Sequence, residues 1–123
     1  MRNVEKILKL EQNITINSPE LLNESRECLD NVIKILDDNH IVSDSKYIIG
    51  LAAHVYAMVE RSQNHESVMD IDDELLNQVA EKYKQLAKMC IESFGKDFEI
   101  QNYKSELFLM AVHIQNLAER EEL

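Results

Sequence analysis

Glycine and proline are unusually scarce in this chain, which has two glycines and one proline in 123 residues. Tight turns draw heavily on these two residue types, so a fold built from many short strands and turns is disfavoured. A chain of this length forms one domain with a hydrophobic core of its own. These features predict an all-α protein, a compact bundle of four to five helices joined by few connections.

The first 17 residues give a mixed signal. Val4, Ile7, Leu8 and Leu10 have helical spacing, whereas residues 13–17 alternate like a strand. This segment is therefore a short helix, an arm that contacts a partner, or a linker remnant. We divide the chain into this N-terminal segment, 1–17, and a single helical domain, 18–123.

Apolar spacing and capping residues place the helices of the domain. Serine at the N-cap and proline at the first helical position are typical of a helix start, and glycine of a helix end. The expected helices run from Ser18-Pro19 to about Leu36, from a cap at 43–45 to about Gln63, through the apolar stripe from Leu75 to Phe94 with Gly95 as its stop, and from Tyr103 to Arg120.

Composition and charge exclude several classes of protein. The net charge is -10, and 13 basic residues are spread among 23 acidic ones. Binding to nucleic acid or to an anionic membrane surface needs clustered Lys and Arg, so neither is expected. The start of the chain has no signal-peptide apolar region and no run reaches membrane-spanning length, which favours the cytoplasm. Cys28 and Cys90 are expected to be core-filling thiols.

Two histidines, His54 and His113, lie inside apolar helical stretches and are the strongest functional candidates. An imidazole combines a nucleophilic nitrogen, proton exchange near neutral pH and metal affinity. A helical projection places His54 at the edge of the buried face, two turns before Arg61. Glu106 lies seven residues before His113 on one side of the last helix, about 10 Å away along the axis. Spacing alone favours structural histidines.

Other site chemistry has no support in the sequence. Neither histidine has a carboxylate or a second histidine three or four residues before it, so no metal site is expected. No glycine-rich phosphate loop or nucleophile elbow is present. We therefore expect no cofactor, no catalytic residue and no enzymatic activity. His40 and His65 fall in expected loops and are interpreted as surface residues.

The two histidine segments resemble the signatures of a known family, the PTS regulation domain (PRD). Ala53-His54-Val55 followed by Arg61 resembles the first signature, although an aspartate often stands at the position of Ala53. Glu106, seven residues before the histidine of Ala111-Val112-His113-Ile114, resembles the second. The middle of the chain also fits the family, with Ala80, Tyr83 and Ala87 ahead of Phe94-Gly95.

The resemblance covers about Asp44 to Ala118 and extends back to Pro19, as a single stand-alone module. PRD modules are helical bundles that usually dimerise, and their histidines accept phosphoryl groups from HPr or enzyme IIB of the sugar phosphotransferase system. The resemblance implies that His54 and His113 are phosphoacceptors, with Arg61 and Glu106 as supporting residues.

The resemblance further implies a non-enzymatic regulator that forms a homodimer and acts through an unknown effector protein. Such regulators include antiterminator-like proteins in transcriptional or metabolic control. A phosphate on His54 is expected to pair with Arg61 and to be repelled by the surplus acids.

Two other interpretations remain. The first is a helical dimerisation or protein-interaction module whose histidines are structural. The second is a two-component histidine phosphotransfer protein, which favours Lys and Gly three and four residues after the histidine. This chain has Ala57-Met58 and Asn116-Leu117 at those positions, which disfavours that class.

Overall fold

The structure is a computed structural model that describes residues 4–41 and 46–120, without the side chain of Arg120. Within these ranges all regular structure is helical, which confirms the all-α prediction. The helices are α1 (Val4–Glu11), α2 (Leu22–Asp38), α3 (Ile48–Gln63), α4 (Asp73–Asn77), α5 (Glu81–Glu92) and α6 (Tyr103–Arg120), with a short 3-10 helix, η1 (Pro19–Leu21), before α2.

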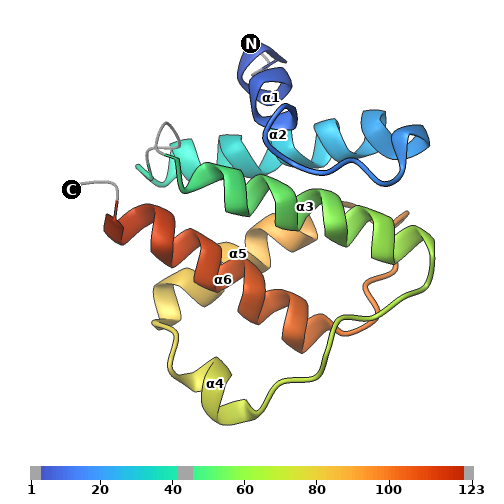
Figure 1. The fold of residues 1–123 in the computed structure, drawn as a ribbon. Helices are drawn as coiled ribbons and strands as arrows, with labels where there is room; N and C mark the ends of the chain where they lie inside the picture. Colours follow the sequence, from blue (N-terminus) through green and yellow to red (C-terminus); the bar gives the residue numbers. More distant parts are fainter. Residues whose placement is uncertain (1–3, 42–45, 121–123) are drawn as a thin grey trace.

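Helix α3 lies between α2 and α6 (Figure 1). Helix α6 packs on α3, α5 and α4, and α5 also packs on α2. Burying one Leu or Ile side chain contributes about 1.5–3 kcal/mol, so this apolar contact is what holds the bundle together. The fully buried apolar side chains include Leu29, Ile33 and Leu36 of α2, Leu51, Val55, Met58 and Val59 of α3, Ala87 and Cys90 of α5, and Met110, Ile114 and Leu117 of α6.

The stripe expected as one third helix is divided into α4 and α5, so that prediction is wrong in its continuity. Ala80 has an extended backbone with ψ of 140°, which interrupts the helical path. Val79, just before this bend, is buried, while Leu75 of α4 is 41% exposed. The side chain of Val79 is therefore buried at a break between two helices. In a continuous helix, its direction would follow from the helical period alone.

The expected ends of the helices agree closely with the structure. Pro19 opens the first helical segment, although its first turn is the 3-10 helix η1 and Ser18 makes no side-chain capping bond. Gly95 has a φ of 87° and ends the segment after α5, as expected for a glycine stop. The cap expected at 43–45 lies outside the described residues.

Two exposed histidines also end helices. His40 follows the C-cap of α2 and has a φ of 62°, in the left-handed region. The N–H of Ile41 donates to the carbonyl of Leu36 at 2.9 Å, which is the long bond of a Schellman motif. His65 after α3 has a φ of 55° and the same pattern of bonds. Both are surface residues, as the sequence indicated, and both shape a helix end.

Three possibilities were left open for the first 17 residues, and the structure shows a short helix there, α1. α1 packs on α2 and buries Ile7 and Leu10. Its last residue, Glu11, accepts two hydrogen bonds from the Arg26 guanidinium, at 2.6 and 2.8 Å, and one from the Tyr56 hydroxyl. This cluster joins α1, α2 and α3. The hydrogen bonds from Arg26 lower the pKa of the Glu11 carboxyl, against the opposing effect of burial.

We predict that Glu11→Gln lowers the free energy of unfolding by about 1–2 kcal/mol at pH 7, because charge-assisted hydrogen bonds are lost. The folded pKa of Glu11 lies below its ordinary value of 4.5. The stabilisation is therefore present above that value and disappears as the pH falls through the lowered pKa. Urea denaturation at pH 7 measures the loss. Glu5→Gln, an exposed change on the same helix, is the control, and equal losses in the two variants would contradict the prediction.

Candidate functional site

His54 is buried in α3, with 5% of its side chain exposed. The predicted place at the edge of the buried face is therefore wrong. A projection of one helix cannot show which side a neighbour covers, and α6 packs along α3. The interpretation as a hydrogen-bonded boundary residue also fails for one ring nitrogen, because Nε2 is sealed from solvent and has no hydrogen-bond partner in the described part of the chain.

His113 of α6 is half-buried and faces His54. The centroids of the two imidazole rings lie 5.5 Å apart, with a tilt of 31° between the ring planes. The two histidines, 59 residues apart by their numbers in the sequence, thus form one pair.

Gly50 makes the approach of α6 to α3 possible at this point. A Cβ atom on Gly50 would lie 3.2 Å from both Nδ1 and Cε1 of His113, which is tighter than ordinary contact. Glycine inside a helix costs about 0.5–1 kcal/mol relative to alanine. Room for the His113 ring gives a physical reason for a glycine here.

Arg61 and Glu106 form a bidentate ion pair between α3 and α6. The Arg61 Nε–H donates to Oε2 of Glu106 at 2.9 Å, and a terminal N–H donates to Oε1 at 2.7 Å. The Glu106 side chain is 3% exposed and that of Arg61 is 22% exposed. A buried carboxylate needs such a partner, because unpaired burial of a charge is costly. Arg61 is expected from the sequence to pair with a phosphate on His54; in this structure it is bound to Glu106.

The ion pair lies beside the imidazole pair. Oε1 of Glu106 is 3.8 Å from Nε2 of His54, which is close but too long for a hydrogen bond. Glu106 and His113 are separated along α6, and His54 of α3 reaches the neighbourhood of both. The structure therefore gathers all four residues named from the sequence. It adds Gly50, whose only signal in the sequence is its place four residues before His54.

Burial dominates the electrostatics of both imidazoles. Desolvation lowers the pKa of His54 to about 3, and the neighbouring His113 and Arg61 act in the same direction. Burial also lowers the pKa of His113. Each ring therefore holds a nitrogen lone pair at neutral pH, which is the form that can attack an electrophile such as phosphorus.

Other parts of the described chain show less potential for chemistry. Among residues 4–41 and 46–120 no three His, Cys, Asp or Glu side chains gather as metal ligands. Cys28 and Cys90 are buried free thiols, and desolvation raises the pKa of each to about 12. Such thiols are poor nucleophiles. In the described ranges no helix has the length and apolar character needed to cross a bilayer.

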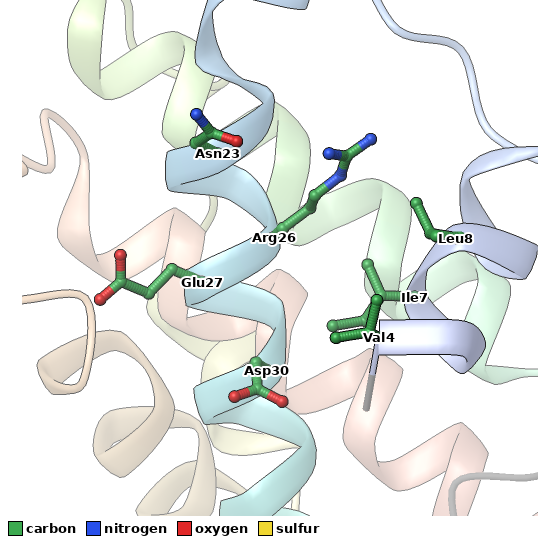
Figure 2. Close-up of a pocket in the computed structure, with 7 residues that line it drawn as sticks. All are labelled: Val4, Ile7, Leu8, Asn23, Arg26, Glu27 and Asp30. Atoms are coloured by element: carbon green, nitrogen blue, oxygen red, sulfur yellow. The ribbon is translucent and has the colours of Figure 1, made fainter. Parts of the chain in front are cut away.

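Two surface pockets differ in their relation to the histidines. Figure 2 shows a pocket between the apolar side chains of α1 and polar side chains of α2, and its lining includes neither histidine. A second pocket is lined by residues between Thr15 and Ser25, by part of α3 and by Arg61. Arg61 thus binds buried Glu106 and also lines a pocket open to solvent.

Comparison with known families places this bundle. The family model described as PRD domain matches residues 26–117, more than half of the chain, and the matched region contains His54, Arg61, Glu106 and His113. The chain therefore belongs to the PRD domain family, whose members are regulatory modules associated with the sugar phosphotransferase system. Searches of curated proteins and of solved structures find no match. Helix α1 lies before the matched region.

We predict that the free energy of unfolding falls between pH 7 and pH 5.5 by about 1 kcal/mol through His54 alone. The folded pKa of His54, about 3, lies below its ordinary value of 6.5. Between these values the unfolded chain binds a proton that the folded chain excludes, so stability is full above 6.5 and decreases below it. Urea denaturation of wild type and of His54→Gln at several pH values measures the slope. The same slope in both proteins would show that His54 titrates normally in the fold.

We predict that Arg61→Ala lowers the free energy of unfolding by about 2–3 kcal/mol, because Glu106 remains buried without its cation. This is less than the ~3–5 kcal/mol typical of a wholly buried pair, since Arg61 is 22% exposed. Replacing both partners with leucine should recover most of the loss. Lys104→Ala, which breaks the exposed pair with Asp73, is the control and should cost at most about 1 kcal/mol. Equal losses from the two single variants would refute the structural weight given to Arg61.

Proposed function

We propose that this PRD domain is a non-enzymatic phosphoacceptor that regulates a partner in response to the sugar phosphotransferase system. His54 and His113 accept phosphoryl groups from HPr or from an enzyme IIB, and Arg61 and Glu106 support them by joining α3 to α6 beside the two rings. The signal passes through a homodimer or an effector protein of transcriptional or metabolic control. Membership in the PRD family gives the regulatory class; the acceptor residues, donors and assembly are the proposal.

One observation carries most of the weight, namely two imidazoles kept neutral by burial and held 5.5 Å apart beside an arginine–carboxylate pair. A neutral imidazole is a competent nucleophile at cytoplasmic pH. Phosphoryl transfer requires mainly in-line positioning and stabilisation of charge. Arg61 is the cation next to this site, and guanidinium groups form bidentate hydrogen bonds with phosphate oxygens.

A second function is favoured by the burial of His54. With Nε2 sealed and only 5% of the side chain exposed, His54 also fits a structural residue in a helical dimerisation or protein-interaction module. The two functions differ in one respect that can be measured. A phosphoacceptor must open enough for a donor to reach a ring nitrogen, whereas a structural histidine never receives phosphate.

We predict that incubation with enzyme I, HPr and ³²P-labelled phosphoenolpyruvate gives an acid-labile, alkali-stable label on the chain, as expected of phosphohistidine. Parallel reactions use enzyme IIB proteins as the donor. The double variant His54→Gln/His113→Gln should lose the label. The control is His40→Asn/His65→Asn, which keeps a residue that tolerates the left-handed backbone at both helix ends.

The control should be labelled like wild type. Absence of label on wild type with HPr and with every IIB donor would overturn the phosphoacceptor function in favour of the interaction module. Label that persists in the double variant would show that the acceptor lies elsewhere. Circular dichroism of each variant establishes that it is folded before it is labelled.

A further inference from the structure

Arg61, the cation beside His54, already has a partner. Two N–H groups of the Arg61 guanidinium donate to the Glu106 carboxylate. Its Oε1 atom lies 3.8 Å from Nε2 of His54. A phosphoryl group on Nε2 of His54 would therefore lie beside this carboxylate. Two anions would then compete for one guanidinium.

We propose that phosphorylation of His54 breaks the Arg61–Glu106 pair, moves the guanidinium onto the phosphoryl group and expels the carboxylate. The pair then acts as a latch between α3 and α6 that opens when His54 carries phosphate. This inference rests on the proposed function, since it requires that His54 accepts a phosphoryl group. It adds the means by which that event changes the fold.

The transfer itself adds negative charge at the latch. With HPr as the donor, the N–P bond of its phosphohistidine breaks while a new N–P bond forms on the lone-pair nitrogen of His54. The donor leaves as neutral imidazole and keeps the proton on its other nitrogen, and His54 keeps its own N–H. Because His54 keeps its N–H, the phosphorylated ring carries a positive charge beside the two negative charges of the phosphoryl group, and the site gains one net negative charge. The phosphoryl oxygens and the Glu106 carboxylate then repel each other in a poorly solvated place.

The geometry favours Arg61 as the group that moves. Its side chain is 22% exposed and lines the pocket beside residues 15–25, whereas Glu106 is 3% exposed. Arg61 can therefore turn without crossing the core. The phosphoryl group offers three acceptor oxygens and more charge than a carboxylate, so it is the stronger partner for the guanidinium. Once Arg61 has moved, the Glu106 carboxylate has lost its cation, and its burial becomes energetically unfavourable.

The ends of α3 and α6 around the latch contain polar groups that lack partners. Ser62 follows Arg61 in α3, and Ser105 precedes Glu106 in α6. Both hydroxyl oxygens are buried and without a hydrogen-bond partner in the part of the chain described. Such groups weaken the closed state, since a buried unsatisfied hydroxyl costs about 1–3 kcal/mol. The ion pair thus holds this end of the helix contact closed, and its loss releases the start of α6 first.

The test is hydrogen exchange on the full chain before and after phosphorylation by enzyme I, HPr and phosphoenolpyruvate. It uses the His113→Gln variant, so that His54 is the only proposed acceptor. Phosphorylation should speed amide exchange at least tenfold over the last turn of α3 and the first two turns of α6. Exchange in the part of α2 that packs on α5 should stay the same. The Arg61 Nε–H signal in ¹⁵N NMR should shift at the same time.

A substitution supplies a second readout. Glu106→Gln in the same background removes the competing anion and should increase the rate of His54 labelling at least tenfold. Asp73→Asn, which neutralises an exposed acid paired with Lys104 at the start of α6, is the matched control and should leave the rate unchanged. If Glu106→Gln does not fold, the exchange and NMR measurements decide alone.

The outcomes separate the two claims. Label on His54 with unchanged exchange and an unchanged Arg61 signal overturns the latch and leaves the proposed function intact. A Glu106→Gln protein that folds but is labelled no faster than its Asp73→Asn control also overturns the latch. No label on any histidine, in this variant or in wild type, overturns the proposed function and the latch with it.

Discussion

The buried carboxylate of Glu106 is the constraint on which the site depends. A charge that is 3% exposed requires a cation close by, and the guanidinium of Arg61 on the neighbouring helix supplies it. The pair joins the end of α3 to the beginning of α6, while Gly50 near the start of α3 meets His113 near the end of α6. The two helices are therefore antiparallel and in a fixed register, and this register brings the two imidazoles together.

Burial then determines the chemical state of the imidazoles. The Glu106 carboxylate lies 3.8 Å from Nε2 of His54, yet desolvation by burial lowers the pKa of His54 to about 3. The same burial that keeps a nucleophilic lone pair available also closes the site around Nε2. Reactivity and access therefore depend on different conformations, and a bundle whose helices separate at one end can supply both.

The helical class and most helix ends followed from the sequence because they depend on local patterns, whereas the four candidate site residues came from the family resemblance and stay a prediction. Glycine and proline act on the backbone within a few residues. Their scarcity, the helix start at Pro19 and the helix stop at Gly95 are therefore local signals. The break at Ala80 did not follow, since the burial of Val79 depends on what packs beside it. The left-handed backbone at His40 and His65 was not predicted, because histidine is an uncommon residue in that region.

The geometry of the site required the tertiary structure. Arg61 and Glu106 are 45 residues apart, and no spacing rule joins them. The sequence placed His54 at a boundary because one helix shows its own apolar face and not the helix that covers its other side. Glu11, Arg26 and Tyr56 likewise meet only when α1 folds back on α2 and α3. Long-range polar contacts of this kind are what the sequence alone could not specify.

Nuclear Overhauser spectroscopy on histidine-labelled protein shows whether α3 and α6 hold His54 and His113 as one pair. With ring centroids 5.5 Å apart, we expect cross-peaks between the ring protons of the two imidazoles. If each ring shows cross-peaks to other neighbours and none to the other ring, the pair does not exist.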